Sequence, residues 1–172
     1  MHFDMPIEQM LRRSDTRFQF GFAHEASDLV PESEEFLLKA SKRGLLVLGR
    51  HEDALAAPVG TLRDVYGPKL DVQPPRVRLI EGVQVQEPVM HVRVALKTPF
   101  RAAVETAMAA RGATADEAYV RGNYCVLRYE APLARLLGLS AELNARTEGN
   151  AKHWIALSHY ALVTGDPGGR AA

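Results

Sequence analysis

Apolar and polar side chains alternate most regularly in the second half of the chain. Every second residue is apolar over two long stretches there, which is typical of strands that bury one face. Two further segments carry apolar residues with helical spacing, and the first of these ends at Gly112. The pattern predicts strands over 90–97, 118–120, 124–130 and 153–163 and helices over 98–112 and 132–146. This order, β-α-β-β-α-β, is that of the ferredoxin-like sandwich, whose helices cover one face of the sheet.

The first half is less regular and predicts a shortened copy of the same sandwich. Its pattern predicts helices over 4–11, 27–43 and 51–66, and strands over 17–24, 45–48 and 69–80. Pro58 should kink the last helix or shift its start, and Pro74-Pro75 should mark a sheet edge or a bulge. We therefore expect an α+β protein of two ferredoxin-like sandwiches, 1–81 (shortened, with an N-terminal helix) and 82–172, with a frayed tail from 165.

Composition narrows the class of protein. The 172 residues include 21 basic and 21 acidic side chains, whereas a general nucleic-acid binder usually carries a strong basic excess. No apolar run approaches the roughly 20 residues of a membrane helix. Asp4 and Glu8 interrupt any signal-peptide pattern, and the single Cys125 cannot form an internal disulfide. We therefore expect a cytoplasmic protein with no membrane partner.

The sequence lacks the motifs of nucleotide and metal sites. Neither G-x-x-x-x-G-K-[ST] nor G-x-G-x-x-G occurs, so no nucleotide partner is expected. The histidines have no metal-ligand spacing; His153 and His159, for example, would lie roughly 20 Å apart along one strand. Cys125 alternates with other apolar strand positions and is expected in the core rather than as a nucleophile. The sequence thus predicts no catalytic residue, no metal and no cofactor, in a protein that is not an enzyme.

Five short segments of the second half resemble the last domain of elongation factor G and its relatives, in the same order and at the same spacing. They are 87–94 (EPVMHVRV, against EPIMKVEV), 110–112 (ARG, against RRG), 130–133 (EAPL, against EVPL), 146–149 (RTEG, against LTQG or MTSG) and 158–160 (SHY, in FSHY). Each segment alone is weak, but the ordered set is specific. The resemblance covers residues 87–163 and implies a ferredoxin-like domain V there.

The first half shows a fainter likeness to domain III of the same GTPases. The segments are 49–55 (GRHEDAL, against GMGELHL), 62–67 (LRDVYG, against LRRDYG) and 74–77 (PPRV in both). A III-like half joined directly to a V-like half is similar to the BipA and LepA branches, which lack the decoding-centre domain IV. Since we expect the GTPase domain to be absent, the resemblance implies only the non-catalytic half of such a factor. In the family that half sits near the stalk base of the large ribosomal subunit.

One face of the predicted second sheet has no helix to cover it. Alternation places cations and aromatic rings together on this face, which suits phosphate contact and base stacking. The candidate RNA- or partner-binding residues are Arg93, Lys97, Tyr124, Arg128, Trp154 and Tyr160. The same rings would serve to pack the sheet against the first half or against a second copy of the chain. A plain solvated face is the third possibility.

Two functions of different class are consistent with these features. The first is a non-catalytic, ribosome- or RNA-associated accessory protein, with the large ribosomal subunit or its rRNA as partner. The alternative is a protein-interaction module, or a self-associating homo-oligomer, that kept the fold but lost ribosome binding. An enzyme with a small-molecule pocket between the halves has no motif in its support.

Overall fold

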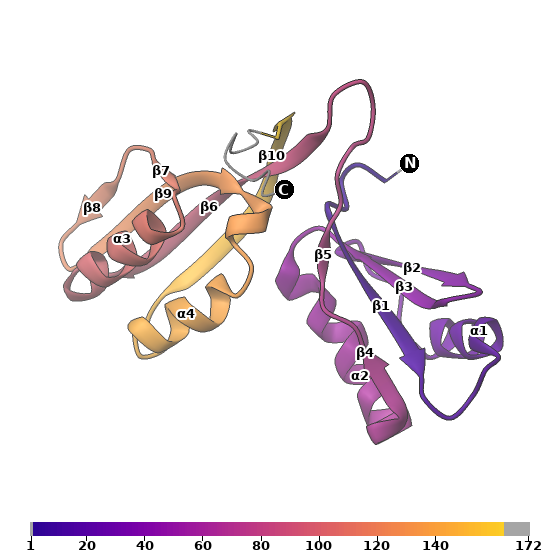
Figure 1. Ribbon diagram of the computed structural model, residues 1–172. Helices are drawn as coiled ribbons and strands as arrows, with labels where there is room; N and C mark the ends of the chain where they lie inside the picture. Colours follow the sequence, from indigo (N-terminus) through magenta and orange to yellow (C-terminus); the bar gives the residue numbers. More distant parts are fainter. Residues whose placement is uncertain (1, 164–172) are drawn as a thin grey trace, which may run out of the picture.

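The computed structural model describes residues 2–163, which form two units, each an antiparallel sheet with helices packed on one side (Figure 1). The strands of the first sheet lie within residues 7–77 and those of the second within 86–162, and the exposed segment 81–85 connects them. The predicted frayed tail, 165–172, lies outside the described residues. Within the described part, no helix is long and apolar enough to cross a membrane.

The first unit is a complete ferredoxin-like sandwich rather than the shortened one that the sequence predicts. Its elements are β1 (Ile7–Arg13), α1 (Gln19–Leu29), β2 (Phe36–Ser41), β3 (Gly44–Gly49), η1 (Glu52–Leu55), α2 (Ala56–Tyr66), η2 (Gly67–Lys69), β4 (Leu70–Val72) and β5 (Arg76–Val77). The strands lie in the order β2-β3-β1-β4, every pair is antiparallel, and β5 also pairs with β1. The α+β class with two ferredoxin-like units is confirmed, and the expected shortening of the first unit is wrong.

Three predicted elements of the first unit are wrong. The helix over 4–11 is β1, the strand over 17–24 is the start of α1, and the helix over 27–43 contains β2. In β1, Ile7 and Leu11 are fully buried, but Gln9 between them on the same face is polar. The apolar alternation of this strand is therefore broken, while the added Met10 on the other face imitates a helical stripe.

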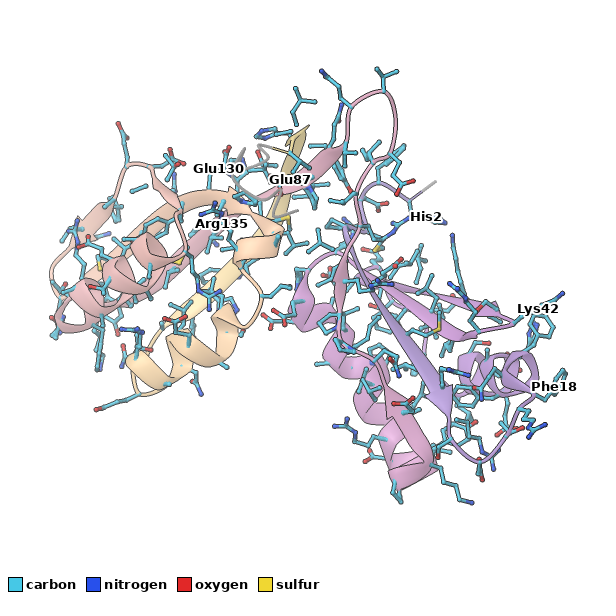
Figure 2. The ribbon with its side chains drawn as sticks, viewed as in Figure 1. His2, Phe18, Lys42, Glu87, Glu130 and Arg135 are labelled. Carbon is cyan, nitrogen blue, oxygen red and sulfur yellow. The ribbon has the colours of Figure 1, made fainter. Side chains whose placement is uncertain are left out.

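The error at α1 comes from three phenylalanines at alternate positions. The residues that are buried are Gln19, Phe22, Ala23 and Ala26, whose spacing is that of one helix face. Phe18 is 69% exposed and lies at the end of the first unit that faces away from the second (Figure 2). Burial against the sheet, rather than the alternation of the rings, decides that this segment is a helix.

Two further elements of the first unit are confirmed, and the strand predicted over 69–80 is instead two short strands, β4 and β5. The strand over 45–48 lies in β3, and the helix over 51–66 is η1 followed by α2. Pro58 is the third residue of α2, in the first turn, where its missing N–H breaks no helical hydrogen bond. The edge of the sheet is interrupted at residues 73–75, between β4 and β5, as Pro74-Pro75 predicts.

The second unit follows the predicted order closely. Its elements are β6 (Gln86–Lys97), η3 (Thr98–Phe100), α3 (Arg101–Ala110), β7 (Thr114–Ala115), β8 (Tyr119–Arg121), β9 (Tyr124–Pro132), η4 (Leu133–Arg135), α4 (Leu139–Arg146) and β10 (Lys152–Leu162). The sheet order is β10-β6-β9-β7, with β8 also paired to β9. The helix predicted over 132–146 is interrupted, because Gly138 adopts a left-handed conformation (φ 78°) between η4 and α4.

A small polar contact joins the two units. The carboxylate of Asp53 lies 2.9 Å from Ser140 Oγ and 2.8 Å from His153 Nε2. Beside it, the backbone N–H of Gly138 donates to Glu52 Oε2 at 2.8 Å. The hydrogen bond to His153, opposed in part by desolvation, lowers the pKa of Asp53 below its usual range. We call Asp53, Ser140 and His153 the inter-unit clamp.

Candidate functional site

The candidate site is the face of the second sheet that its helices leave uncovered. On β6, Met90, Val92, Val94 and Leu96 are at most 1% exposed and face α3 and α4. The alternate positions therefore face outward, where His91, Arg93 and Lys97 are exposed. The pairing of β6 with β9 and β10 brings outward residues of these strands beside them. Five of the six candidate residues therefore lie on the outer face, as the sequence predicts.

A row of three side chains crosses the middle of this outer face. Arg93 lies opposite Trp154 of β10 on one side and opposite Arg128 of β9 on the other. The Arg93 guanidinium carbon is 4.3 Å from the centroid of the Trp154 ring, a cation–π contact. Trp154 nevertheless keeps 48% of its surface exposed. Among the described residues, neither arginine has a carboxylate partner within 4.0 Å, so both charges remain available to a ligand.

Lys97 and Tyr124 form a second pair at one end of the face. They lie opposite each other on β6 and β9, and Tyr124 is 61% exposed. On the neighbouring β8, Arg121 lies opposite Tyr124 and Tyr119 lies opposite Val126. This end therefore repeats the combination of exposed ring and cation found in the central row.

The other end of the face carries a carboxylate between two histidines. Glu130 lies 3.6 Å from His91 Nδ1 and 4.0 Å from His159 Nδ1. Among residues 2–163, no group of three His, Cys, Asp or Glu side chains is arranged to hold a metal ion. A shallow hollow of about 380 Å³ lies beside this end, lined by Arg93, Arg128 and Trp154 among others.

Tyr160 does not share the face with the other five candidates. A bulge between Leu157 and His159 shifts the register of β10 by one residue, which reverses the faces beyond it. Tyr160 therefore lies opposite the buried Pro88, donates a hydrogen bond to the backbone oxygen of Phe3 (2.7 Å) and packs edge-on against the Phe3 ring. It joins the two units instead of facing a ligand, and His159 takes the outward position.

Among residues 2–163, the first half does not cover the outer face, which is one of the uses that the sequence leaves open; at the β10 edge, Trp154 and Ala156 line a cavity together with Arg50 and His51 of the first unit. The second unit instead contacts the first through the inter-unit clamp and through Tyr160. Arg93, Tyr124, Arg128 and Trp154 all remain exposed. The face is consequently open to an external partner.

Two residues of the outer face are not among those that the sequence predicts for it. Tyr119 is 58% exposed on β8, and the weak strand predicted over 118–120 already contains it, so pairing that strand with β9 would have found it. His159 is outward only because of the bulge in β10, for which the sequence carries no signal.

The clamp resembles a catalytic triad in composition but not in geometry. In a triad the two ring nitrogens of histidine divide the roles, one facing the hydroxyl and the other the carboxylate. Here Nε2 of His153 lies 2.7 Å from Ser140 Oγ and 2.8 Å from Asp53 Oδ2, and Ser140 also contacts Asp53 directly. The same nitrogen serves both partners, so the group links the two units and does not activate the hydroxyl.

Cys125 belongs to the core, as predicted. It is 1% exposed on the inner face of β9, and burial raises the pKa of its thiol. Tyr129 lies on the same inner face of β9 and is 5% exposed, and burial raises the pKa of its hydroxyl to about 12. Both groups therefore remain protonated near neutral pH.

Comparison with known proteins assigns the second unit. The sequence model of the family described as "Elongation factor G C-terminus" matches residues 84–170, about half of the chain. The chain belongs to this family. The match includes the whole of the second sheet and begins inside the connecting segment, so the likeness of the first unit to domain III stays a prediction.

A solved structure of a protein from Thermus thermophilus has a similar fold. It superposes with a TM-score of 0.67 at 15% sequence identity, over 92% of this chain. The likeness thus includes both units, and at this identity it concerns the fold alone. The chain spans 41% of the length of that protein.

Proposed function

We propose that this protein is a non-catalytic factor of the cytoplasm that associates with RNA of the large ribosomal subunit through the outer face of its second sheet. Its family membership supports a relation to the C-terminal part of translation elongation factors. The single observation that carries the proposal is the exposed row Trp154–Arg93–Arg128, in which a ring and two uncompensated cations lie side by side. Rings stack on unpaired bases of any identity, and arginines contact phosphates or stack themselves.

Self-association through the same face is the less favourable alternative. A two-fold dimer sets the same patch of each copy against the other. The central pair Arg93 and Arg128 would then face like charges, in a region whose carboxylates are chiefly those of Glu130 and Asp116. A polyanionic partner has the opposite sign and meets no such penalty.

Co-sedimentation with purified ribosomes and separate subunits, across a salt series, tests the proposal. We expect retention on the large subunit that is lost as salt rises, because phosphate contacts release counterions. Trp154→Ala should weaken binding by about 5- to 100-fold through lost stacking, and Arg128→Ala should reduce the salt dependence.

Two exposed residues of the first unit provide matched controls. Phe18→Ala removes an exposed ring and Arg63→Ala an exposed cation, both far from the outer face of the second sheet, and binding should be unchanged. Binding that ignores salt, or that falls equally in the control variants, would contradict the proposal. Failure of the unmodified protein to pellet at low salt would point to a protein partner instead.

A further inference from the structure

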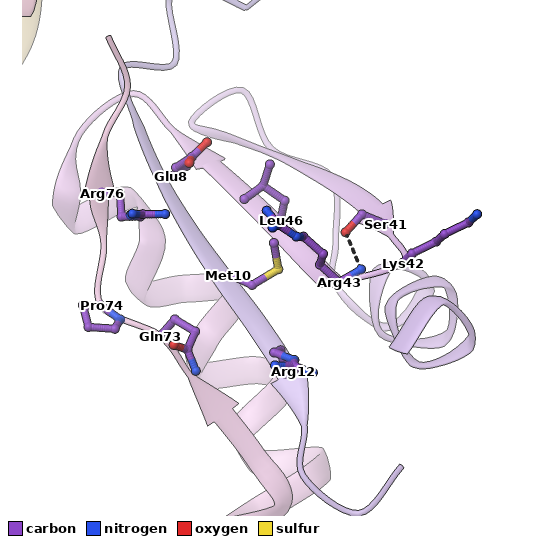
Figure 3. A pocket seen from close by; sticks show the side chains of 10 residues that line it. All are labelled: Glu8, Met10, Arg12, Ser41, Lys42, Arg43, Leu46, Gln73, Pro74 and Arg76. Carbon is purple, nitrogen blue, oxygen red and sulfur yellow. Dashed lines mark hydrogen bonds between the residues drawn. The ribbon is translucent and has the colours of Figure 1, made fainter. Parts of the chain in front are cut away.

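The first sheet also exposes a face without helices, and it is hollowed. A concavity of about 850 Å³ lies over β1, between the turn that joins β2 to β3 on one side and the interrupted edge strand on the other (Figure 3). Its floor is apolar, formed by Met10 and Leu46, which lie opposite each other on β1 and β3. Gln73 and Pro74, which connect β4 to β5, line one side of the hollow.

Four cations surround this hollow. They are Arg12 of β1, Lys42 and Arg43 of the β2–β3 turn, and Arg76 of β5, and all four are exposed. Among the described residues, the only carboxylate that lines it is that of Glu8, which lies 3.7 Å from the Arg78 side chain. In the part of the chain that the structure describes, none of the four cations has a carboxylate within 4.0 Å. Cationic side chains thus outnumber carboxylates around the hollow, although Arg12 lies opposite Asp71 and Arg76 lies opposite Glu8 in the strand register.

The spacing of the cations suits a chain of anions better than one small anion. Arg76 lies opposite Glu8, and Arg12 is four residues further along β1, so their backbones are roughly 13 Å apart along the strand. On the other side of the floor, Arg43 of the turn extends toward Leu46, whereas the side chain of the neighbouring Lys42 points away from the hollow (Figure 3). A single phosphate could meet one rim, whereas successive phosphates of a strand can meet both.

We propose that this hollow holds the sugar–phosphate backbone of RNA without contacting the bases. Its lining, as far as the structure describes the chain, contains no aromatic ring, so it offers no stacking platform, in contrast to the outer face of the second sheet. The inference rests on the proposed function, since both faces would serve one RNA-associated factor. It adds a second, sequence-independent contact made by the first unit.

The test compares two double variants that each remove two positive charges from the full chain. Arg43→Gln/Arg76→Gln removes cations of the hollow, and Arg17→Gln/Arg63→Gln removes exposed cations of the same unit outside it. Binding is measured by fluorescence anisotropy against a short labelled oligoribonucleotide and an abasic strand of the same length, over a salt series. The slope of log affinity against log salt should fall by about 1.4 in the hollow variant for both strands, and remain unchanged in the control.

Several outcomes would overturn the inference. These are equal slopes in the two double variants, a loss confined to the base-bearing strand, and competition by polyglutamate or inorganic triphosphate as effective as that by the abasic strand. Arg43→Gln alone, on the exposed turn, repeats the test without changing a strand residue and should lower the slope by about 0.7. Ribosome co-sedimentation of the unmodified protein reports the proposed function separately, so either idea can fail without the other.

Discussion

The two sheets share one topology but expose different chemistry on their uncovered faces. The second sheet presents Trp154 and Tyr124 among its cations, whereas the first presents an apolar floor of Met10 and Leu46 with cations only at the rim. In both, most of the alternate positions that face the helices are apolar and buried, and the polar Gln9 of β1 is an exception. The fold therefore constrains one face of each sheet and leaves the other free to acquire a binding chemistry.

The two units also resemble each other in stabilising one fully buried polar side chain each. In the first, the Gln19 amide donates to the backbone oxygens of Arg13 and Thr16 and accepts from the Arg13 N–H. In the second, the Thr147 hydroxyl donates to the Leu143 oxygen and accepts from the Ala151 N–H. Each side chain links a helix by hydrogen bonds to the backbone of a neighbouring strand or loop.

The largest expected effect is the loss of stability when one core leucine is removed from either unit. Leu11→Ala and Leu96→Ala each empty a fully buried site and should lower the free energy of unfolding by about 2–5 kcal/mol. Urea denaturation is followed by circular dichroism and by fluorescence of Trp154, the single tryptophan, which lies in the second unit. Leu11→Ala should shift the fluorescence transition less than Leu96→Ala does. Equal shifts would mean that the units unfold as one, and Val65→Ala, at a 54% exposed position, is the control.

A smaller effect is expected from the buried polar side chains. Gln19→Leu and Thr147→Val each leave backbone groups without their partners, which should cost about 1–3 kcal/mol of unfolding free energy. The same denaturation experiment measures it. A change below about 0.5 kcal/mol in either variant would show that water replaces the lost hydrogen bonds at that junction.

The inter-unit clamp should contribute less, and in a pH-dependent way. Asp53 is 44% exposed, so Asp53→Asn should cost no more than about 1 kcal/mol. Because the folded protein lowers the pKa of Asp53, this contribution is fully present above the ordinary carboxyl pKa of about 3.9 and is lost as the pH falls through the lower folded value. The difference between wild type and variant should therefore shrink below about pH 4. Asp64→Asn, at an exposed position on α2, should show no such trend.

The smallest effect compares single cations on the two outer faces. Arg93→Gln removes a cation–π contact and should lower the unfolding free energy by about 0.5–1 kcal/mol, with a shift in the Trp154 emission. Arg12→Gln, at the rim of the first hollow, should remain within about 0.5 kcal/mol of wild type. A larger loss for Arg12→Gln would indicate that this cation serves stability and not a ligand.

Sequence reasoning succeeded where one face of a strand is uniformly apolar and failed where polar residues interrupt it. In β6, the inward residues Met90 to Leu96 are all apolar, so both the strand and its outward cations could be predicted. In β1, the polar Gln9 on the inward face breaks the apolar alternation, so the sequence pattern predicts a helix there. Because the sequence pattern predicts helices where β1 and β2 lie, it does not place the cations of the first hollow on one face of a sheet. The sequence therefore does not predict this site.

By itself, the sequence determined the fold class, the family of the second unit and five residues of the outer face, since these depend on local periodicity and on ordered motifs. Tertiary structure alone decided which segments of the first unit pair as strands, that Tyr160 turns toward Phe3, and that distant cations gather around one hollow. The physical reason is that strand pairing and bulges are set by partners far along the chain, which no local pattern of hydrophobic residues records.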